Sequence, residues 1–156
     1  MQYQSYLIDA TRHAGSRFFD FARAVPADKL EWAPAEGART TLDIAREIAM
    51  CPQWGIDTVE GMPEWDEAVM AEYERQTKAL VTLDDCQTEF NRRMDKLAEY
   101  VSGLDDEFLK EERDLIFTPG RKWKVADLID FPRWNCTYHI GQVAYIQTCY
   151  GDKDMH

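Results

Sequence analysis

The sequence has little positive charge and no long apolar segment. Lys and Arg number 18 against 29 Asp and Glu, for a formal net charge of −11 at pH 7. Because phosphate backbones and anionic lipid surfaces attract clustered positive charge, this balance argues against nucleic acid and membranes as partners. No apolar run approaches the roughly 18 residues needed to cross a bilayer. Residues 1–5 have neither the basic flank nor the apolar core of a secretory signal, so we expect a cytoplasmic protein.

Cysteine is scarce, and the four that occur are widely separated: Cys51, Cys86, Cys136 and Cys149. Disulfide scaffolds are normally small and dense in cysteine, and cysteine-based zinc sites normally use closely spaced pairs. The sequence therefore predicts reduced thiols and no structural zinc site built from cysteine. Gly-rich phosphate loops and the motif Gly-x-Ser-x-Gly are also absent, so nothing supports nucleotide chemistry or serine hydrolysis.

What the chain does contain is enough apolar surface for a core. Hydrophobic residues make up 45% of its 156 residues and aromatic residues 12%, which excludes intrinsic disorder. A chain of this length normally forms one domain. We therefore expect residues 1–156 to form a single domain.

The apolar residues recur at helical spacing in four long segments. The first ends at Pro26, the second runs from Thr40 or Thr41 to Gly61, the third from Thr82 to Gly103, and the last from about Lys124 to Tyr150. Each is bounded by residues that typically cap or stop helices. Four long helices with short polar connections predict an all-α protein, a four-helix bundle.

Several local features are less regular. Two prolines lie inside predicted helices: Pro52 is expected to kink or break its helix, and Pro132 to bend the last one. Residues 61–81 have no clear pattern, and a short helix over residues 66–79 is one interpretation. Residues 115–117 are predicted to be extended. The connector over residues 26–34 cannot continue the first helix, yet it carries Leu30 and Trp32, so we expect it to run along the bundle.

One face of the last helix is apolar at both ends and polar in its middle. Leu128, Phe131, Asn135, His139, Gln142 and Ile146 follow one another at steps of three and four residues. Burying a polar side chain without a hydrogen-bond partner costs stability, so we expect these three side chains to have partners inside the bundle. The pattern is compatible with an internal hydrogen-bond network and with a metal or substrate site, since bundles build such sites on facing helices.

Three segments together resemble the DinB/YfiT-like superfamily. Residues 134–143 (WNCTYHIGQV) are similar to its last-helix signature, residues 40–49 (TTLDIAREIA) to its second-helix segment, and residues 26–34 to its Leu-x-Trp-x-Pro connector. The resemblance covers essentially the whole chain in the family's order. It implies a DinB/YfiT-like four-helix bundle, usually a homodimer, with three histidines binding a divalent metal and low-molecular-weight thiols as transfer partners.

The resemblance places the three metal ligands at Glu47, Asn135 and His139. Cys51, one turn after Glu47, and Gln142 from the polar stripe are expected to line the same cavity, where Cys51 is either a soft ligand or a small core residue. Only one of the three is a histidine, and an amide oxygen is a weak substitute for an imidazole nitrogen. We therefore expect a degenerate site with no tightly bound cofactor, or at most a divalent metal such as Zn, Ni, Fe or Mn. On the helical pattern alone, Glu47 is a boundary residue.

Two classes of function stay open at this point, and whether the protein is an enzyme stays open with them. One is a small-molecule-binding protein or interaction module that acts without a tightly bound transition metal. The other is a divalent-metal-dependent enzyme, a thiol-dependent transferase or hydrolase, with Glu47, Asn135 and His139 as ligands. A second apolar stripe on the last helix, formed by Trp134, Tyr138, Gly141 and Tyr145, is expected either to form a homodimer contact or to pack against the connector.

Overall fold

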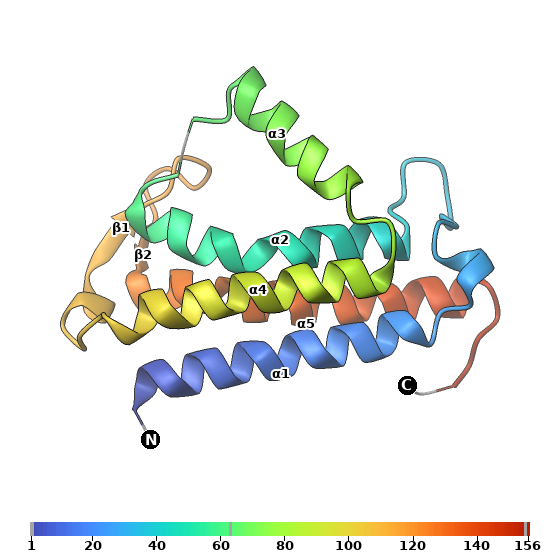
Figure 1. The fold of residues 1–156 in the computed structure, drawn as a ribbon, viewed down its shortest axis with the longest axis horizontal. Helices are drawn as coiled ribbons and strands as arrows, with labels where there is room; N and C mark the ends of the chain where they lie inside the picture. The colour runs from blue at the N-terminus through green and yellow to red at the C-terminus, as the bar shows by residue number, and fades with distance from the viewer. Residues whose placement is uncertain (1, 63, 155) are drawn as a thin grey trace.

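The computed structural model describes residues 2–62, 64–154 and 156. Within this part of the chain there are five α-helices, drawn in Figure 1. They are α1 (Tyr3–Arg23), α2 (Thr41–Glu60), α3 (Glu67–Lys78), α4 (Leu83–Ser102) and α5 (Val125–Cys149). Two single turns of 3₁₀ helix, Ala27–Lys29 and Phe108–Lys110, and two short strands complete the described secondary structure.

The ends of the long helices follow from local chemistry. The Thr40 side chain accepts a hydrogen bond from the Asp43 amide at the start of α2, and Thr82 and Asp85 form a reciprocal capping box at the start of α4. Such caps satisfy amides that have no partner inside the helix. Pro52 and Pro132 both lie inside continuous helices, so the expectation that Pro52 might break α2 is wrong.

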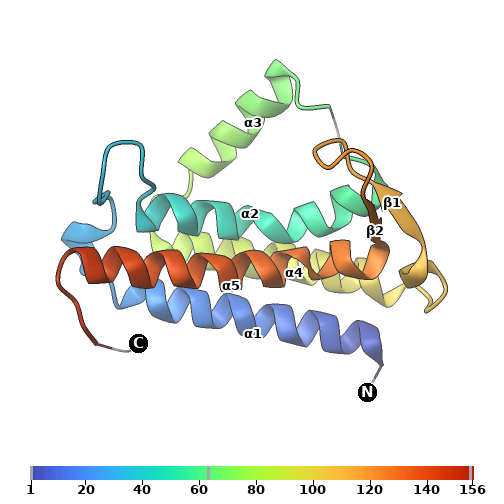
Figure 2. The same ribbon diagram turned by 180° about the vertical axis from the view of Figure 1, so that it is seen from behind.

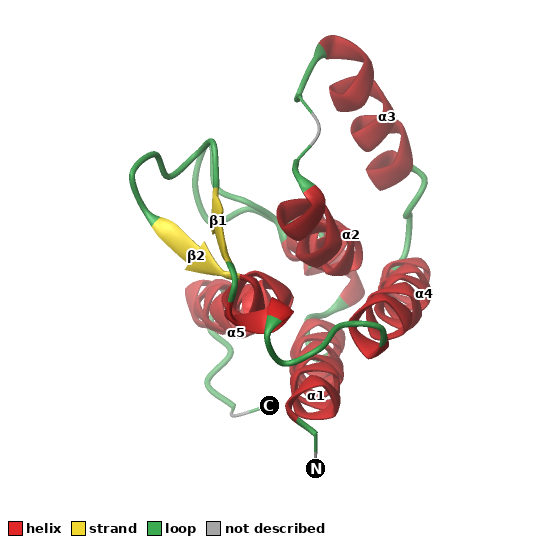
Figure 3. Ribbon diagram, turned by 90° about the vertical axis from the view of Figure 1, so that its left-hand side faces the viewer, coloured by secondary structure: helices red, strands yellow, loops and turns green. Residues whose placement is uncertain are grey.

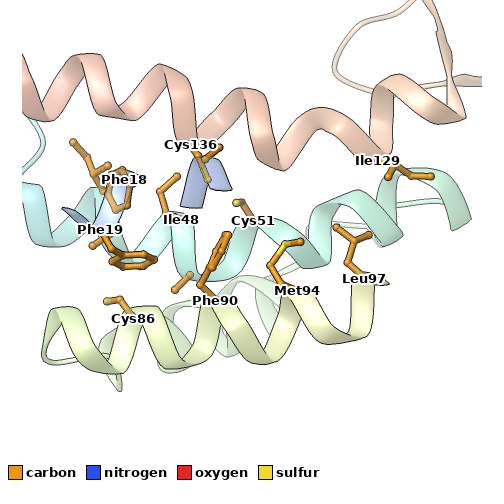
Figure 4. Close-up of a cluster of buried hydrophobic side chains, with 14 of the residues drawn as sticks. Phe18, Phe19, Ile48, Cys51, Cys86, Phe90, Met94, Leu97, Ile129 and Cys136 are labelled. Carbon is orange, nitrogen blue, oxygen red and sulfur yellow. The ribbon is translucent and has the colours of Figure 1, made fainter. Parts of the chain in front are cut away.

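The four long helices pack around one core, which confirms the predicted four-helix bundle. Helices α1 and α2 each pack against both α4 and α5, and the end-on view in Figure 3 shows the four axes at the corners of a square. The largest fully buried side chains include Phe18 and Phe19 from α1, Ile48 from α2 and Phe90 from α4. Figure 4 shows several of them between the helices.

Helix α3 stands apart from this bundle. It leaves the end of α2 and returns at an angle to the start of α4 (Figures 1 and 2), and none of its residues is buried. Two hydrogen bonds connect this region to the bundle: Arg93 on α4 donates to Gln76 on α3 at 2.8 Å, and Arg46 on α2 donates at 3.0 Å to the carbonyl of Leu80, just after α3. The irregular segment therefore does contain a helix, close to the predicted residues 66–79.

The extended segment predicted at residues 115–117 is misplaced. Strand β1 (Glu112–Asp114) precedes it and pairs in antiparallel register with β2 (Lys122–Lys124). Acidic residues of β1 face lysines of β2, and Lys122 bonds to Asp114 at 2.5 Å. Oppositely charged cross-strand neighbours favour this pairing. The apolar residues at 116 and 117 lie instead in the exposed turn between the strands.

The connector between α1 and α2 runs along the end of the bundle, as expected. Leu30 and Trp32 are partly buried against the core. The indole of Trp32 meets the Tyr150 ring edge to face, with centroids 5.9 Å apart. This contact joins the connector to the C-terminal end of α5. In the part of the chain that the structure describes, no helix is long and apolar enough to span a membrane.

Two glycines, Gly15 and Gly141, differ in the space that surrounds them. A Cβ atom added at Gly15 on α1 would lie 2.2 Å from Cζ of the buried Phe90, whereas one at Gly141 on α5 would meet nothing within 4 Å. We expect Gly15→Ala to lower the free energy of unfolding by about 1–3 kcal/mol through overpacking. Gly141→Ala should raise it by about 1 kcal/mol, because glycine is a poor helix former. Urea denaturation of both variants measures the two signs, and equal effects would contradict this account of the core.

Candidate functional site

Two neighbouring helices supply the side chains that the sequence analysis singled out. Glu47 lies on α2, one position before the fully buried Ile48. Asn135 and His139 lie four residues apart on α5 and therefore share one face of that helix. Both are buried and face α2. The packing of α2 against α5 brings all three into one cluster.

The Glu47 carboxylate is the centre of this cluster. Its Oε1 accepts a hydrogen bond from Asn135 Nδ2 at 3.2 Å and lies 3.0 Å from His139 Nε2. Its Oε2 forms an ion pair with the Arg39 guanidinium, which also donates to the Asp43 carbonyl at 2.8 Å. One carboxylate thus binds donors from the connector and from the last helix.

Both ring nitrogens of His139 are engaged. Nε2 faces Glu47, and Nδ1 lies 2.6 Å from Oε1 of Gln142. Gln142 in turn donates to the hydroxyl of Tyr138 at 3.2 Å. The imidazole is only 3% exposed. A metal ion would therefore have to break a hydrogen bond to reach either nitrogen.

Electrostatics keep Glu47 ionised. Burial alone raises the pKa of this carboxyl, but hydrogen bonds from His139 and Arg39 outweigh burial and lower the pKa from 4.5 to about 2. A buried charge is tolerated only when it is paired and hydrogen-bonded, and here both conditions hold. Because Arg39 neutralises the carboxylate, the cluster offers a cation little attraction.

Cys51, expected to line a cavity, has no exposed surface and lies in the core beside Cys136 (Figure 4). Burial raises the pKa of the Cys51 thiol, and the neighbouring Cys136 thiol adds to the effect. A thiol that stays protonated is neither a good metal ligand nor a nucleophile. Cys51 is therefore part of the core packing behind the cluster.

A cleft of about 560 Å³ lies between the connector and the outer face of α5. Gln142 lines this cleft together with Arg39, Ile44 and Tyr138, whereas Glu47, Asn135 and His139, with which it was expected to share a cavity, do not. A ligand in the cleft can contact Arg39 and Gln142 directly, whereas His139 lies behind them. The polar cluster of Glu47, Asn135 and His139 therefore lies behind the cleft wall, and it bonds to the wall residues Arg39 and Gln142.

The sequence analysis missed Arg39. It precedes the N-cap of α2 in a polar connector, where an arginine is normally solvated, and no spacing relates it to the last helix. Its position depends on the path of the connector, which the contact of Trp32 with Tyr150 helps to define. Among the described residues, no group of three or more His, Cys, Asp or Glu side chains is arranged to hold a metal ion.

The lowered pKa of Glu47 predicts a pH dependence of stability. Because the folded-state pKa is about 2 and the ordinary value is 4.5, the stabilisation is complete above pH 4.5 and is lost as the pH falls toward 2. The whole shift would correspond to about 3 kcal/mol, but the Glu47 side chain is partly exposed and solvent screens its interactions, so we expect about 1–2 kcal/mol at neutral pH. Glu47→Gln should remove it, and urea denaturation across this pH range should show the difference from wild type shrinking toward low pH.

Glu72 provides the matched control for that measurement. Hydrogen bonds from Arg75 and Gln76 also lower its pKa to about 2, but the carboxylate is exposed on α3. Exposed ion pairs contribute little because solvent screens them. Glu72→Gln should therefore leave stability nearly unchanged at every pH. A wild-type advantage over Glu47→Gln that did not vary with pH would contradict the ionised carboxylate.

Comparisons with known proteins identify relatives only at the level of the fold. No protein-family model and no curated protein matches the sequence significantly. Among solved structures, YfiT from Bacillus subtilis superposes with a TM-score of 0.72 over 97% of this chain and 90% of its own, at 10% identity. An uncharacterised protein from Clostridium difficile 630 gives 0.70 over 95% and 97%, at 13% identity.

A third structure corrects the exclusion of nucleic acid. The colibactin self-resistance protein ClbS, which was crystallised in complex with double-stranded DNA, has a TM-score of 0.64 over 94% of this chain and 96% of its own, at 11% identity. The expectation of no nucleic-acid partner, which was based on net charge, is therefore wrong: composition does not exclude such a partner for this fold. Net charge averages over the whole surface, whereas phosphate contacts depend on local patches.

These likenesses concern the backbone. Identities of 10–13% do not transfer the role of any residue, but the superpositions cover nearly the whole of each chain. YfiT is described as a probable metal-dependent hydrolase with an unusual four-helix bundle topology. The architecture that the sequence motifs predicted is confirmed: this chain has the DinB/YfiT-like four-helix-bundle fold.

Proposed function

We propose that this protein binds a small organic molecule in the cleft beside α5 and holds no transition metal tightly. The observation that carries the proposal is the pairing of Glu47 with Arg39, Asn135 and His139. In this arrangement the residues that the family resemblance marks as metal ligands bind one another. The polar cluster then serves to position Arg39 and Gln142 on the cleft wall.

The chemistry of the donor set supports this proposal. Only His139 offers a nitrogen, and Zn²⁺, Ni²⁺ and Fe²⁺ prefer imidazole or thiolate ligands to a neutral amide. The guanidinium on Glu47 repels a second cation at close range. A bound metal would require Arg39 to leave and Asn135 to turn its carbonyl oxygen toward the ion, so the residues present do not fit a transition metal.

The shape and lining of the cleft support the proposed binding of a small organic molecule. Pockets that bind small molecules are typically a few hundred Å³ in volume, mostly apolar, with a few polar groups that fix orientation. The cleft of about 560 Å³ matches this description, since Ile44 and two tyrosine rings lie beside Arg39 and Gln142. Its polar groups are held in place by the bonds to Glu47 and His139.

A divalent-metal-dependent hydrolase is the second candidate. It is favoured by one observation, the likeness of the fold to YfiT, which is described as a probable metal-dependent hydrolase. In that function Glu47, Asn135 and His139 would be the ligands. The two candidates make opposite predictions about the effect of metal on stability.

Thermal melts of tag-free protein with and without Zn²⁺ or Ni²⁺ separate the two candidates. We expect no metal-induced rise in Tm for wild type. The double variant Glu47→His with Asn135→His supplies three imidazoles and should be stabilised by metal, by about 2.7 kcal/mol at a hundredfold excess over Kd. The reason is that a ligand that binds only the folded state shifts unfolding by mass action.

The control is the same double variant carrying His139→Ala as well, which leaves two imidazoles and should lose much of the metal response. A large metal-induced rise in wild type that His139→Ala abolishes would overturn the proposal. It would make the metal-dependent enzyme the better description of the site.

A further inference from the structure

Aromatic rings form a ladder on the outer face of α5. Phe131 stacks on Trp134 with centroids 5.6 Å apart and an interplanar angle of 30°. Trp134 stacks on Tyr138 at 5.3 Å and 16°. Because these residues are spaced by three and four, the rings follow one another along the helix axis. The exposed fractions of Trp134, Tyr138 and Tyr145 are 54%, 51% and 68%.

The ladder is interrupted at Gly141. This position lies three residues beyond Tyr138, a rise of about 4.5 Å along the helix, which is close to the spacing of the rings already stacked. Tyr145 follows four residues later. A Cβ atom at Gly141 would meet nothing within 4 Å. The surface of α5 over Gly141 is therefore flat and open, and it forms the floor of the cleft between Tyr138 and Tyr145.

This floor belongs to the cleft beside the polar cluster. Tyr138, Gly141 and Tyr145 line the cleft together with Arg39 and Gln142. Among the residues that the structure describes, no Asp or Glu lines it, although Asp and Glu number 29 in the chain. The cleft thus combines aromatic surface with one guanidinium, which is held in place by its ion pair with Glu47 behind the wall.

Arg39 has donors left for a ligand. Its recorded hydrogen bonds go to the Glu47 carboxylate and to the Asp43 carbonyl, whereas a guanidinium carries five N–H groups. The side chain is 41% exposed. Its remaining N–H groups are therefore available to an anionic group at the cleft wall, in the geometry that arginine uses for carboxylates.

We propose that the cleft binds a planar aromatic molecule that carries an anionic group. Its ring lies over Gly141 between Tyr138 and Tyr145, where it continues the ladder, and its anion binds Arg39. Aromatic rings prefer offset stacking at such separations. This inference rests on the proposed function, because it requires Arg39 to remain on the cleft wall beside Glu47.

Isothermal titration calorimetry of the full, tag-free chain tests the inference with three probes of similar size. Naphthoate is planar and anionic, decalin carboxylate is anionic and saturated, and naphthylmethanol is planar and neutral. We expect naphthoate to bind best. Loss of stacking and loss of the charge-assisted hydrogen bond should each weaken binding about tenfold.

Two variants locate the binding. Gly141→Phe places a ring on the floor of the cleft and should remove naphthoate binding. Thr148→Phe, on the same exposed face of α5 but beyond Tyr145, is the matched control and should bind naphthoate as wild type does. Melting curves of both variants establish that each is folded, which the open surroundings of Gly141 favour.

A third variant tests the anion. Arg39→Gln should reduce naphthoate affinity to that of naphthylmethanol, about tenfold, while leaving naphthylmethanol binding unchanged. A purely structural role of Arg39 would instead weaken both probes equally. This difference between the two probes separates ligand contact from support of the fold.

Several results would overturn the inference. These are failure of naphthoate to bind wild type, equal affinity for decalin carboxylate, or unchanged binding to Gly141→Phe. If Gly141→Phe altered self-association in light scattering while naphthoate did not bind, the face would be a contact between two copies. None of these results bears on the metal melts, so a failure here leaves the proposed function to its own test, and a metal-stabilised wild type would overturn that function independently.

Discussion

The ionised Glu47 carboxylate is the constraint on which the site depends. A charge inside a helix bundle is stable only if the protein supplies all of its partners, because water supplies few. The carboxylate on α2 finds its partners in two other parts of the chain: Arg39 in the connector, and Asn135 and His139 on α5. The carboxylate therefore couples the path of a loop to the packing of two helices. The cleft exists where these three parts meet.

The helices could largely be predicted from the sequence, because the signals that define them are local. Caps at Thr40 and Thr82 and periodic apolar residues do not depend on distant parts of the chain. The same holds for the polar stripe on α5, since residues four apart must share a face. The turn at residues 116 and 117 was misassigned because apolar side chains favour strands on average, whereas pairing of opposite charges selected the flanking residues.

The positions of Glu47 and Arg39, at the centre of the site, are harder to predict from the sequence. Helical periodicity places Glu47 at the edge of the apolar face, and its inward orientation is decided by donors on another helix. Arg39 carries no local signal, because its position depends on how a connector folds back over α5. Long-range contacts between polar side chains are the part of a structure that pattern analysis reads least well. Chemical function is built mainly from such contacts.

Helix α3 shows what a lack of buried apolar contacts implies for stability. None of its residues is buried, and polar bonds such as that between Arg93 and Gln76 connect it to the bundle. Segments with few buried apolar contacts open with free energies far below that of global unfolding. We therefore expect helix α3 to open locally, so that its amides exchange with solvent while the bundle stays folded. Sequence changes at the exposed positions of α3 are then expected to leave the global stability of the four-helix core nearly unchanged.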